Sequence, residues 1–197
     1  MSHDSETLNV YAQRADEYSA MVHNEDKNPQ LTAFIGGLQG GAHVLDLGCG
    51  PGNSGAAMAR AGLTVDATDA VPEMVALAAA QPGVTARLAR FDEISGDNIY
   101  DGIWANFSLL HAPKADMPAH LARLRHALKP GGLFHIGMKT GIAEHRDSLG
   151  RLYSYYTEHE LTELLKNAGF TPFSSTTGAE KGLDGKLAPW VCIAAHG

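Results

Sequence analysis

A short apolar run that breaks into glycines constrains this chain more than any other feature. Residues 44–52 read Val-Leu-Asp-Leu-Gly-Cys-Gly-Pro-Gly, and an alanine-rich segment begins at Asn53. The apolar run has the length and composition of a buried parallel strand, and the segment after the glycines is typical of a helix. Because glycines remove every Cβ from the turn, a ligand can lie directly against its backbone. The segment therefore predicts a cofactor site in an α/β fold.

Composition and charge exclude several classes of function. The 197 residues suit one domain, and 44% hydrophobic with 19% charged residues is typical of a soluble globular protein. The chain has a net charge of −7 and lacks the run of basic residues that nucleic-acid-binding proteins normally carry. No run approaches the roughly 18 to 20 apolar residues of a membrane span, and the polar N-terminus has no signal-peptide stretch. We therefore expect a cytoplasmic protein with no nucleic-acid or membrane partner.

The two cysteines, Cys49 and Cys192, show neither metal-ligand spacing nor a disulfide framework. This pattern favours a reducing compartment and predicts no bound metal. The sequence leaves a monomer and a homodimer equally open.

Strand and helix patterns alternate from residue 43 onward. Strands are predicted over residues 43–47, 64–68, 84–91, 101–106 and 133–138, and helices over 8–22, 72–80, 117–128 and 157–168, with shorter ones from Pro29 and Asn53. The alternation predicts a Rossmann-like, doubly wound, mostly parallel sheet with helices on both faces. Two further strands, 170–177 and 190–195, follow one another without a helix, so they predict a C-terminal antiparallel hairpin that completes seven strands.

We expect one domain spanning residues 1–197, because no repeat, low-complexity block or linker interrupts it. Within it, residues 1–40 are expected to form a helical lid and residues 41–140 a cofactor-binding core. Residues 141–197 would supply the substrate-side helix and the hairpin.

The glycine spacing and its acidic neighbours indicate which cofactor binds. In a dinucleotide-binding loop, G-x-G-x-x-G places pyrophosphate at a helix N-terminus. Here Asn53 replaces the third glycine, and Pro51 lacks an N–H for a phosphate. Asp46 suits a cationic ammonium or sulfonium, although its oxygens can equally bond the amides of the turn. Asp69 ends the second strand, where a carboxylate can accept both ribose hydroxyls; the alternative is a solvated group or a helix cap.

At this point the residues resemble a family. Residues 44–52 look like motif I of the class I S-adenosylmethionine-dependent methyltransferases, and segments 69–74, 100–111, 128–134 and 160–170 resemble later motifs in the right order. The likeness covers about residues 8–195 and is to small-molecule, tellurite-resistance-like members. It implies S-adenosyl-L-methionine as cofactor, S-adenosyl-L-homocysteine as product, and a small-molecule methyl acceptor.

The resemblance also implies a set of cofactor-binding residues. The glycine loop would line the methionine and ribose, Asp69 would hold the ribose, and residues after the second and third strands would contact adenine. Phe91 is equally suited to an ordinary core position, and the two N-terminal tyrosines to simple packing. The implied residues are Tyr11, Tyr18, Asp46, Gly48, Cys49, Gly50, Asp69, Ala70, Val71, Phe91, Asp92 and Asn106.

Candidate catalytic and substrate residues follow the fourth and fifth predicted strands. His111 lies at the carboxyl end of the sheet, where ligands bind in open α/β folds, and is the candidate general base; the alternative is a histidine that packs the loop. Residues 139–156 are rich in polar and aromatic groups, which suits either a small-molecule pocket or a solvent-exposed helix-loop segment. The candidate substrate residues are His111, Lys139, Arg146, Arg151 and Tyr153.

Two other functions remain as alternatives. A nicotinamide-dependent oxidoreductase is disfavoured by the glycine spacing and by the lack of a Tyr-x-x-x-Lys pair. A non-catalytic module could keep the cofactor fold, although Asp46 and Asp69 are both present. Residues 106–109 are not the Asn/Asp-Pro-Pro-Tyr/Phe signature of members that act on DNA bases or glutamine. The acceptor atom, whether O, N, S or a metalloid, stays open.

Overall fold

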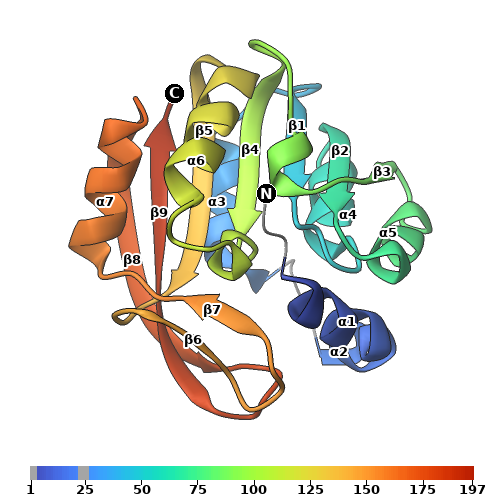
Figure 1. Ribbon diagram of the computed structural model, residues 1–197. Coiled ribbons are helices and arrows are strands. Elements are labelled where there is room, and N and C mark those ends of the chain that lie inside the picture. Colours follow the sequence, from blue (N-terminus) through green and yellow to red (C-terminus); the bar gives the residue numbers. More distant parts are fainter. Residues whose placement is uncertain (1–3, 22–26) are drawn as a thin grey trace.

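A single sheet organises the part of the chain that the structure describes, residues 4–21 and 27–197 of a computed structural model. Its strands lie in the order β3-β2-β1-β4-β5-β9-β8, and β9 alone is antiparallel to both of its neighbours (Figure 1). The strands are β1 (His43–Leu47), β2 (Thr64–Asp69), β3 (Val84–Leu88), β4 (Tyr100–Asn106), β5 (Leu128–Lys139), β8 (Thr171–Lys181) and β9 (Leu187–His196). The predicted fold class, with its C-terminal hairpin, is confirmed.

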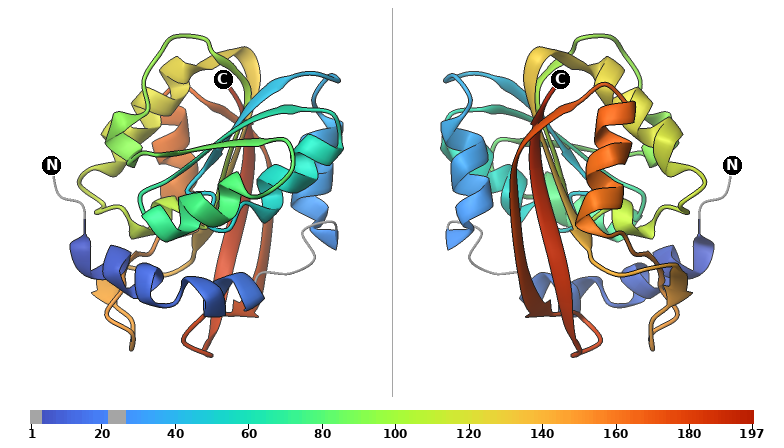
Figure 2. Two further views of the ribbon diagram at one scale, coloured as in Figure 1. Left: turned by 90° about the vertical axis from the view of Figure 1, so that its right-hand side faces the viewer. Right: turned by 90° about the vertical axis from the view of Figure 1, so that its left-hand side faces the viewer.

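Helices cover both faces of the sheet (Figure 2). One face carries α3 (Pro29–Gly36), α4 (Asn53–Arg60) and α5 (Pro72–Ala79). The other carries α6 (Met117–Ala127) and α7 (Glu158–Asn167). This arrangement leaves the carboxyl ends of the parallel strands open for other segments of the chain.

Two N-terminal helices and a small hairpin lie across those carboxyl ends (Figures 1 and 2). The helices are α1 (Ser5–Gln13) and α2 (Ala15–Met21), and the hairpin pairs β6 (Glu144–Arg146) with β7 (Leu152–Ser154). Asp4 caps α1 by accepting a hydrogen bond from the Thr7 backbone N–H. These segments enclose the space in which a ligand of this fold would bind.

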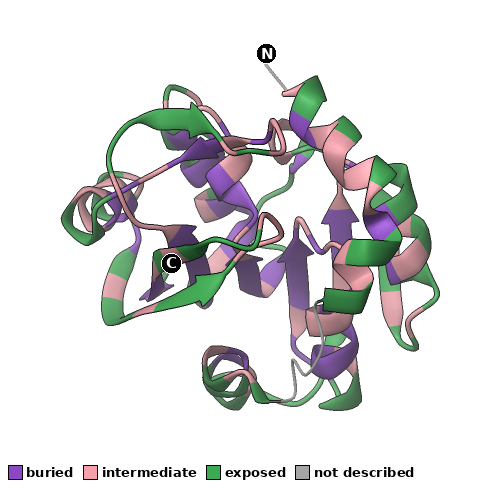
Figure 3. Cartoon of the chain, turned by 90° about the horizontal axis from the view of Figure 1, so that it is seen from below, coloured by how far each residue is buried: buried purple, intermediate pink, exposed green. Residues whose placement is uncertain are grey.

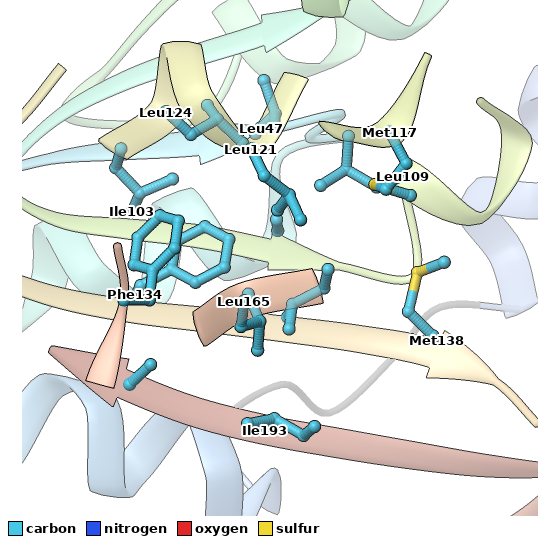
Figure 4. Close-up of a cluster of buried hydrophobic side chains, with 14 of the residues drawn as sticks. Leu47, Ile103, Leu109, Met117, Leu121, Leu124, Phe134, Met138, Leu165 and Ile193 are labelled. Atoms are coloured by element: carbon cyan, nitrogen blue, oxygen red, sulfur yellow. The ribbon is translucent and has the colours of Figure 1, made fainter. Parts of the chain in front are cut away.

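The largest apolar cluster lies between the sheet and the helices α6 and α7 (Figure 4). Leu121 and Leu124 of α6 are buried against Ile103 and Phe134 of the strands. Strand β4 is buried on both faces, as its apolar run predicts, because Trp104 enters a second cluster beneath α3 and α4. Seen from below, the buried residues concentrate in the sheet and exposed ones on the surrounding helices and the outer hairpin (Figure 3).

Several element boundaries differ from the sequence-based expectation. The helix predicted over 8–22 is two helices separated at Arg14, and its last residue lies outside the described part of the chain. The third strand ends at Leu88 because its partner β2 ends at Asp69, so Phe91 instead begins a short 3-10 helix. The fifth strand starts at Leu128, and residues 129–132 form an irregularity within its pairing with β4 rather than a turn before it.

Candidate active site

The loop after β1 depends on its glycines for close packing. Gly48 and Gly50 have positive φ angles of 67° and 52°, which glycine adopts without strain. A Cβ at Gly48 would overlap the Cβ of Ser108, which follows β4. A Cβ at Gly50 would lie 3.3 Å from the Tyr18 ring of α2. The loop is therefore in contact both with the end of β4 and with the N-terminal helices.

Asp69, at the end of β2, is tied to the same loop. One carboxylate oxygen accepts the Gly50 N–H at 2.9 Å, and the other accepts the Val71 N–H at 2.9 Å. Burial raises the pKa of Asp69, and these backbone hydrogen bonds oppose that rise. Because an ionised carboxylate has about four lone-pair sites, Asp69 keeps capacity for a further donor.

A cavity of about 270 Å³ lies beside Asp69 and beneath α1; we call it the inner cavity. Leu8 of α1 and Met74 of α5 supply apolar wall, and Ser108 lines it from the loop after β4. The inner cavity brings together many of the residues that the sequence singles out: Tyr11, Tyr18, Gly48, Gly50, Asp69, Ala70, Val71, Phe91, Asp92 and His111.

A second cavity of about 320 Å³, the outer cavity, lies on the other side of His111, toward the β8–β9 hairpin. Besides residues that it shares with the inner cavity, it gathers other predicted site residues: Asp46, Cys49, Asn106, Lys139, Arg151 and Tyr153. The two cavities share the walls formed by Tyr11, Tyr18, Gly48, Gly50, Phe107 and His111. The shared wall places the loop after β1 and the candidate base at one junction.

A chain of hydrogen bonds crosses this junction. His111 Nδ1 lies 2.7 Å from the carbonyl oxygen of Leu152, and its Nε2 lies 2.9 Å from the Tyr11 hydroxyl. Arg151 donates to the same hydroxyl at 2.8 Å and is held from behind by the Asp147 carboxylate at 2.7 and 3.0 Å. The Arg151 side chain is only 1% exposed, so a permanent positive charge lies at the wall of the outer cavity.

Burial keeps His111 neutral. Its pKa is lowered to about 4, mainly by desolvation and also by the charges of Arg151 and Lys139, while the bond to Leu152 opposes the shift. Burial also lowers the pKa of Lys139, whose ammonium lies 4.4 Å from the centre of the Tyr153 ring. The junction therefore combines a neutral imidazole with fixed positive charge.

Arg146 is the predicted substrate residue that lies outside both cavities. Its guanidinium forms two hydrogen bonds with the Asp4 carboxylate, at 2.9 and 2.8 Å, and a third with the Gly150 carbonyl. These bonds fasten the start of α1 to strand β6. In this structure Arg146 thus connects elements rather than facing a ligand.

The outer cavity also contains aromatic residues that the sequence analysis did not identify. Phe107 has a positive φ of 53°, and its ring contacts that of Trp190 on β9 with centroids 6.2 Å apart. Among the residues described, the indole N–H groups of Trp104 and Trp190 have no hydrogen-bond partner although both residues line this cavity. Hairpin residues 180–183 complete the wall. The only sequence signal for this part of the wall was the glycine-rich loop of the hairpin. That signal does not indicate that the two strands reach the cavity.

Comparison with known proteins shows the class of this fold. Residues 44–132 match the family described as "Methyltransferase domain". This chain has the class I S-adenosylmethionine-dependent methyltransferase fold. The match includes the glycine loop, Asp69, and the loops that carry Asp92 and His111, so it contains part of the junction of the two cavities.

Relatives extend the likeness beyond that core. The 1,6-didemethyltoxoflavin-N1-methyltransferase of Burkholderia thailandensis, solved with 1,6-didemethyltoxoflavin and S-adenosylhomocysteine bound, is 26% identical over 100% of this chain and 91% of its own, with a TM-score of 0.79. A carboxy-S-adenosyl-L-methionine synthase of Chromohalobacter salexigens is 31% identical over 60% of this chain and 48% of its own. A ubiquinone biosynthesis O-methyltransferase of Xylella fastidiosa is 35% identical over 47% and 39% respectively. The chain thus spans less than half of the length of these two curated relatives.

The residues at the junction fit S-adenosylmethionine. The two glycines of the loop line both cavities, and Asp69 can still accept a hydroxyl donor. Ser108 adds a buried hydroxyl at the inner cavity that has no hydrogen-bond partner among the described residues. Within that same part of the chain, no cluster of three or more His, Cys, Asp or Glu side chains is arranged to hold a metal ion. None of its helices is long and apolar enough to cross a membrane.

Proposed function

We propose that this chain transfers a methyl group from S-adenosyl-L-methionine to a small-molecule acceptor. The observation that carries the proposal is the pair of adjoining cavities with Gly48 and His111 in their common wall. A methyl donor and its acceptor must meet at one point, and two cavities that share a wall provide that point. In-line displacement then requires mainly that the protein align the reactants and exclude water.

For the cofactor, we assign the adenosine half to the inner cavity and the amino-acid half to the outer one. Asp69 would hold the ribose, Ala70, Val71, Phe91 and Asp92 would surround the adenine, and Tyr11 and Tyr18 would cover it. Toward the outer cavity, the assigned residues are Asp46, Gly48, Cys49, Gly50 and Asn106. When bound, the cofactor supplies an electrophilic methyl group on a cationic sulfonium.

For the acceptor, we assign the remainder of the outer cavity. Phe107, Tyr153 and Trp190 contribute aromatic rings to its wall, which favours a planar acceptor. The donor groups of Lys139 and Arg151 and the two indole N–H groups favour an acceptor that carries oxygen or nitrogen acceptor atoms. By their names, the Burkholderia and Xylella relatives methylate a nitrogen and an oxygen, and either fits such a site.

We also propose that residues 1–197 act as one functional domain. Residues 1–40 would form the lid, 41–140 the cofactor-binding core and 141–197 the substrate side. The tie between Asp4 and Arg146, and the contact of α1 with both cavities, support this division.

Calorimetry with S-adenosylhomocysteine and with NADH tests the cofactor assignment. We expect S-adenosylhomocysteine to bind and NADH not to bind, and Asp69→Ala to weaken the first at least tenfold. Binding of NADH alone would support the oxidoreductase alternative. Transfer of a labelled methyl group to phenols, thiols, amines, carboxylates or metalloid oxyanions then tests catalysis. Cofactor binding without transfer to any of them would favour the non-catalytic module.

A further inference from the structure

Tyr11 lies where the acceptor, the candidate base and a buried cation meet. Its hydroxyl oxygen is 2.8 Å from the Arg151 guanidinium and 2.9 Å from His111 Nε2. Its side chain lines both cavities, as His111 does. Covering the cofactor does not require these two polar contacts, so they call for a separate explanation.

The direction of each hydrogen bond in this chain follows from its end groups. The Leu152 carbonyl only accepts, so His111 Nδ1 carries the proton and donates to it. A guanidinium only donates, so the Tyr11 oxygen accepts from Arg151. Because His111 is neutral, its Nε2 has a free electron pair, and the Tyr11 O–H donates to it. The nitrogen that would serve as a base is thus already occupied by the Tyr11 proton.

An acceptor in the outer cavity therefore meets Tyr11 before it meets His111 Nε2. The phenol oxygen has two lone pairs. Arg151 uses one of them, and an O–H or N–H of the acceptor would compete with the Tyr153 hydroxyl for the other. Arg151 also favours a partial negative charge on that oxygen, because its own charge is fixed there by Asp147. Burial raises the pKa of Tyr11. Arg151 and the neighbouring Tyr153 hydroxyl oppose this rise.

We propose that Tyr11 takes the proton from the methyl acceptor while it passes its own proton to His111 Nε2. A lone pair of the acceptor atom forms the new bond to the methyl carbon, and the carbon–sulfur pair stays on sulfur. The acceptor's proton ends on Tyr11, and the former Tyr11 proton ends on His111. The net charge of the site does not change, because the positive charge lost at sulfur is replaced by that of the imidazolium. Leu152 stabilises this imidazolium through its carbonyl, and solvent later removes the proton.

This relay rests on the proposed methyl transfer and restricts it to one class of acceptor. It serves acceptors that still hold their proton at the working pH, such as phenols or ring N–H groups. An acceptor that is already ionised gains nothing from it. The acceptor's own pKa therefore separates a proton relay from a purely positional role of Tyr11.

The experiment compares Tyr11→Phe with wild type over a series of substituted phenols, from nitrophenols that are ionised at pH 7.5 (roughly pKa 7 and below) to methoxyphenols that are not (roughly pKa 10). Single-turnover rates are measured at saturating S-adenosylmethionine. We expect Tyr11→Phe to slow the protonated phenols by about 10²–10⁴-fold and the ionised ones by less than about threefold. Equal slowing across the series would overturn the relay. Tyr155→Phe, which changes a tyrosine outside both cavities, is the matched control.

Tyr153→Phe separates the two neighbouring hydroxyls. The relay predicts that its effect does not depend on the acceptor's pKa. A loss confined to protonated phenols in Tyr153→Phe, with Tyr11→Phe unaffected, would assign proton removal to Tyr153 and overturn the proposal.

A measurement without turnover tests the same hydrogen bonds. In ¹⁵N-histidine spectra, with His111 identified by His111→Gln, we expect a protonated Nδ1 and an unprotonated, hydrogen-bonded Nε2 at pH 7. Tyr11→Phe should shift the Nε2 signal toward that of a free acceptor. A protonated Nε2, or no shift, overturns the relay even if no phenol is methylated. Failure of S-adenosylhomocysteine to bind would instead overturn the proposed function and leave this spectral result standing on its own.

Discussion

Asp147 holds the guanidinium of Arg151 through two hydrogen bonds to one carboxylate oxygen, at 2.7 and 3.0 Å. The other oxygen accepts the backbone N–H of Arg151, also at 3.0 Å. Both side chains are almost fully buried, with exposed fractions of 1% for Arg151 and 7% for Asp147. This pair therefore fixes the position of the guanidinium against Tyr11 and the backbone between β6 and β7.

Removing the carboxylate should destabilise the protein strongly. Asp147→Ala leaves the Arg151 charge buried without its partner, so we expect the free energy of unfolding to fall by about 3–5 kcal/mol. Urea denaturation followed by circular dichroism measures the change. Glu163→Ala, which breaks the exposed Glu163–Lys166 pair on α7, is the control and should have no resolvable effect. Similar losses in both variants would contradict a special role for the buried pair.

The sequence alone predicted those features that depend on interactions within one segment of the chain. The apolar run, the glycines and the alanine-rich segment predicted β1, its loop and α4. The position of Asp69 at the end of β2 was predicted from its spacing in the sequence. Thr157, a residue type favoured at helix N-caps, caps α7 by accepting the Glu160 N–H at 3.1 Å. In each case one segment of chain carries the physical reason, so no distant contact is needed to recognise it.

Features that depend on distant contacts were not predictable. Arg146 and Arg151 looked alike in the sequence, yet one is tied to Asp4, 142 residues away, and the other is buried against Asp147 and Tyr11. The polar contacts of Tyr11 arise only when α1 packs on β7. Trp190 reaches the outer cavity because β9 inserts beside β5, a pairing order that no local pattern specifies.

The glycine loop offers a second test, because Gly48 combines a positive φ with a close neighbour. Gly48→Ala adds backbone strain and an overlap with Ser108, whereas Gly41→Ala, at a φ of 80° with no atom within 4 Å, adds strain alone. We expect Gly41→Ala to cost about 1–2 kcal/mol of unfolding free energy and Gly48→Ala about 1–3 kcal/mol more. Gly48→Ala should also abolish binding of S-adenosylhomocysteine in calorimetry. If both variants lose the same unfolding free energy and Gly48→Ala still binds S-adenosylhomocysteine, the loops that carry Gly48 and Ser108 move apart easily.

The ion pair between Asp4 and Arg146 should control how tightly α1 is held. The Arg146 hydrogen bond is the main cause that lowers the pKa of Asp4 to about 2. Asp4→Asn should therefore speed amide hydrogen exchange in α1, with little change in the sheet, and weaken S-adenosylhomocysteine binding severalfold. Glu17→Gln, which breaks the exposed pair with Arg14, is the control. Because the folded pKa is depressed, the contribution of the pair is present above about pH 4 and is lost as the pH falls toward 2. Unchanged exchange in α1 would exclude this role.

Buried neutral histidines should make stability depend on pH well above the range in which carboxylates titrate. Burial lowers the pKa of His135 to about 3 and, as the main cause, that of His111 to about 4, whereas both titrate near 6.5 in the unfolded chain. The unfolded state then binds more protons than the folded state below pH 6.5. Each histidine therefore contributes stability above that pH, and loses about 1.4 kcal/mol of it per pH unit down to its folded pKa.

Replacing one of them should make this dependence shallower. His135 stacks on Trp104 with ring centroids 3.7 Å apart, and its Nε2 lies 3.0 Å from the Asn106 side-chain oxygen. Because an amide oxygen only accepts, Nε2 donates, and Gln offers a similar N–H that does not titrate. We expect His135→Gln to lower the slope of unfolding free energy between pH 6.5 and 5 by about 1 kcal/mol per pH unit, measured by urea denaturation. His126→Gln changes a histidine whose side chain is 78% exposed and should leave the slope intact. A His135→Gln slope equal to that of wild type would mean that His135 is solvated or already protonated in the folded protein.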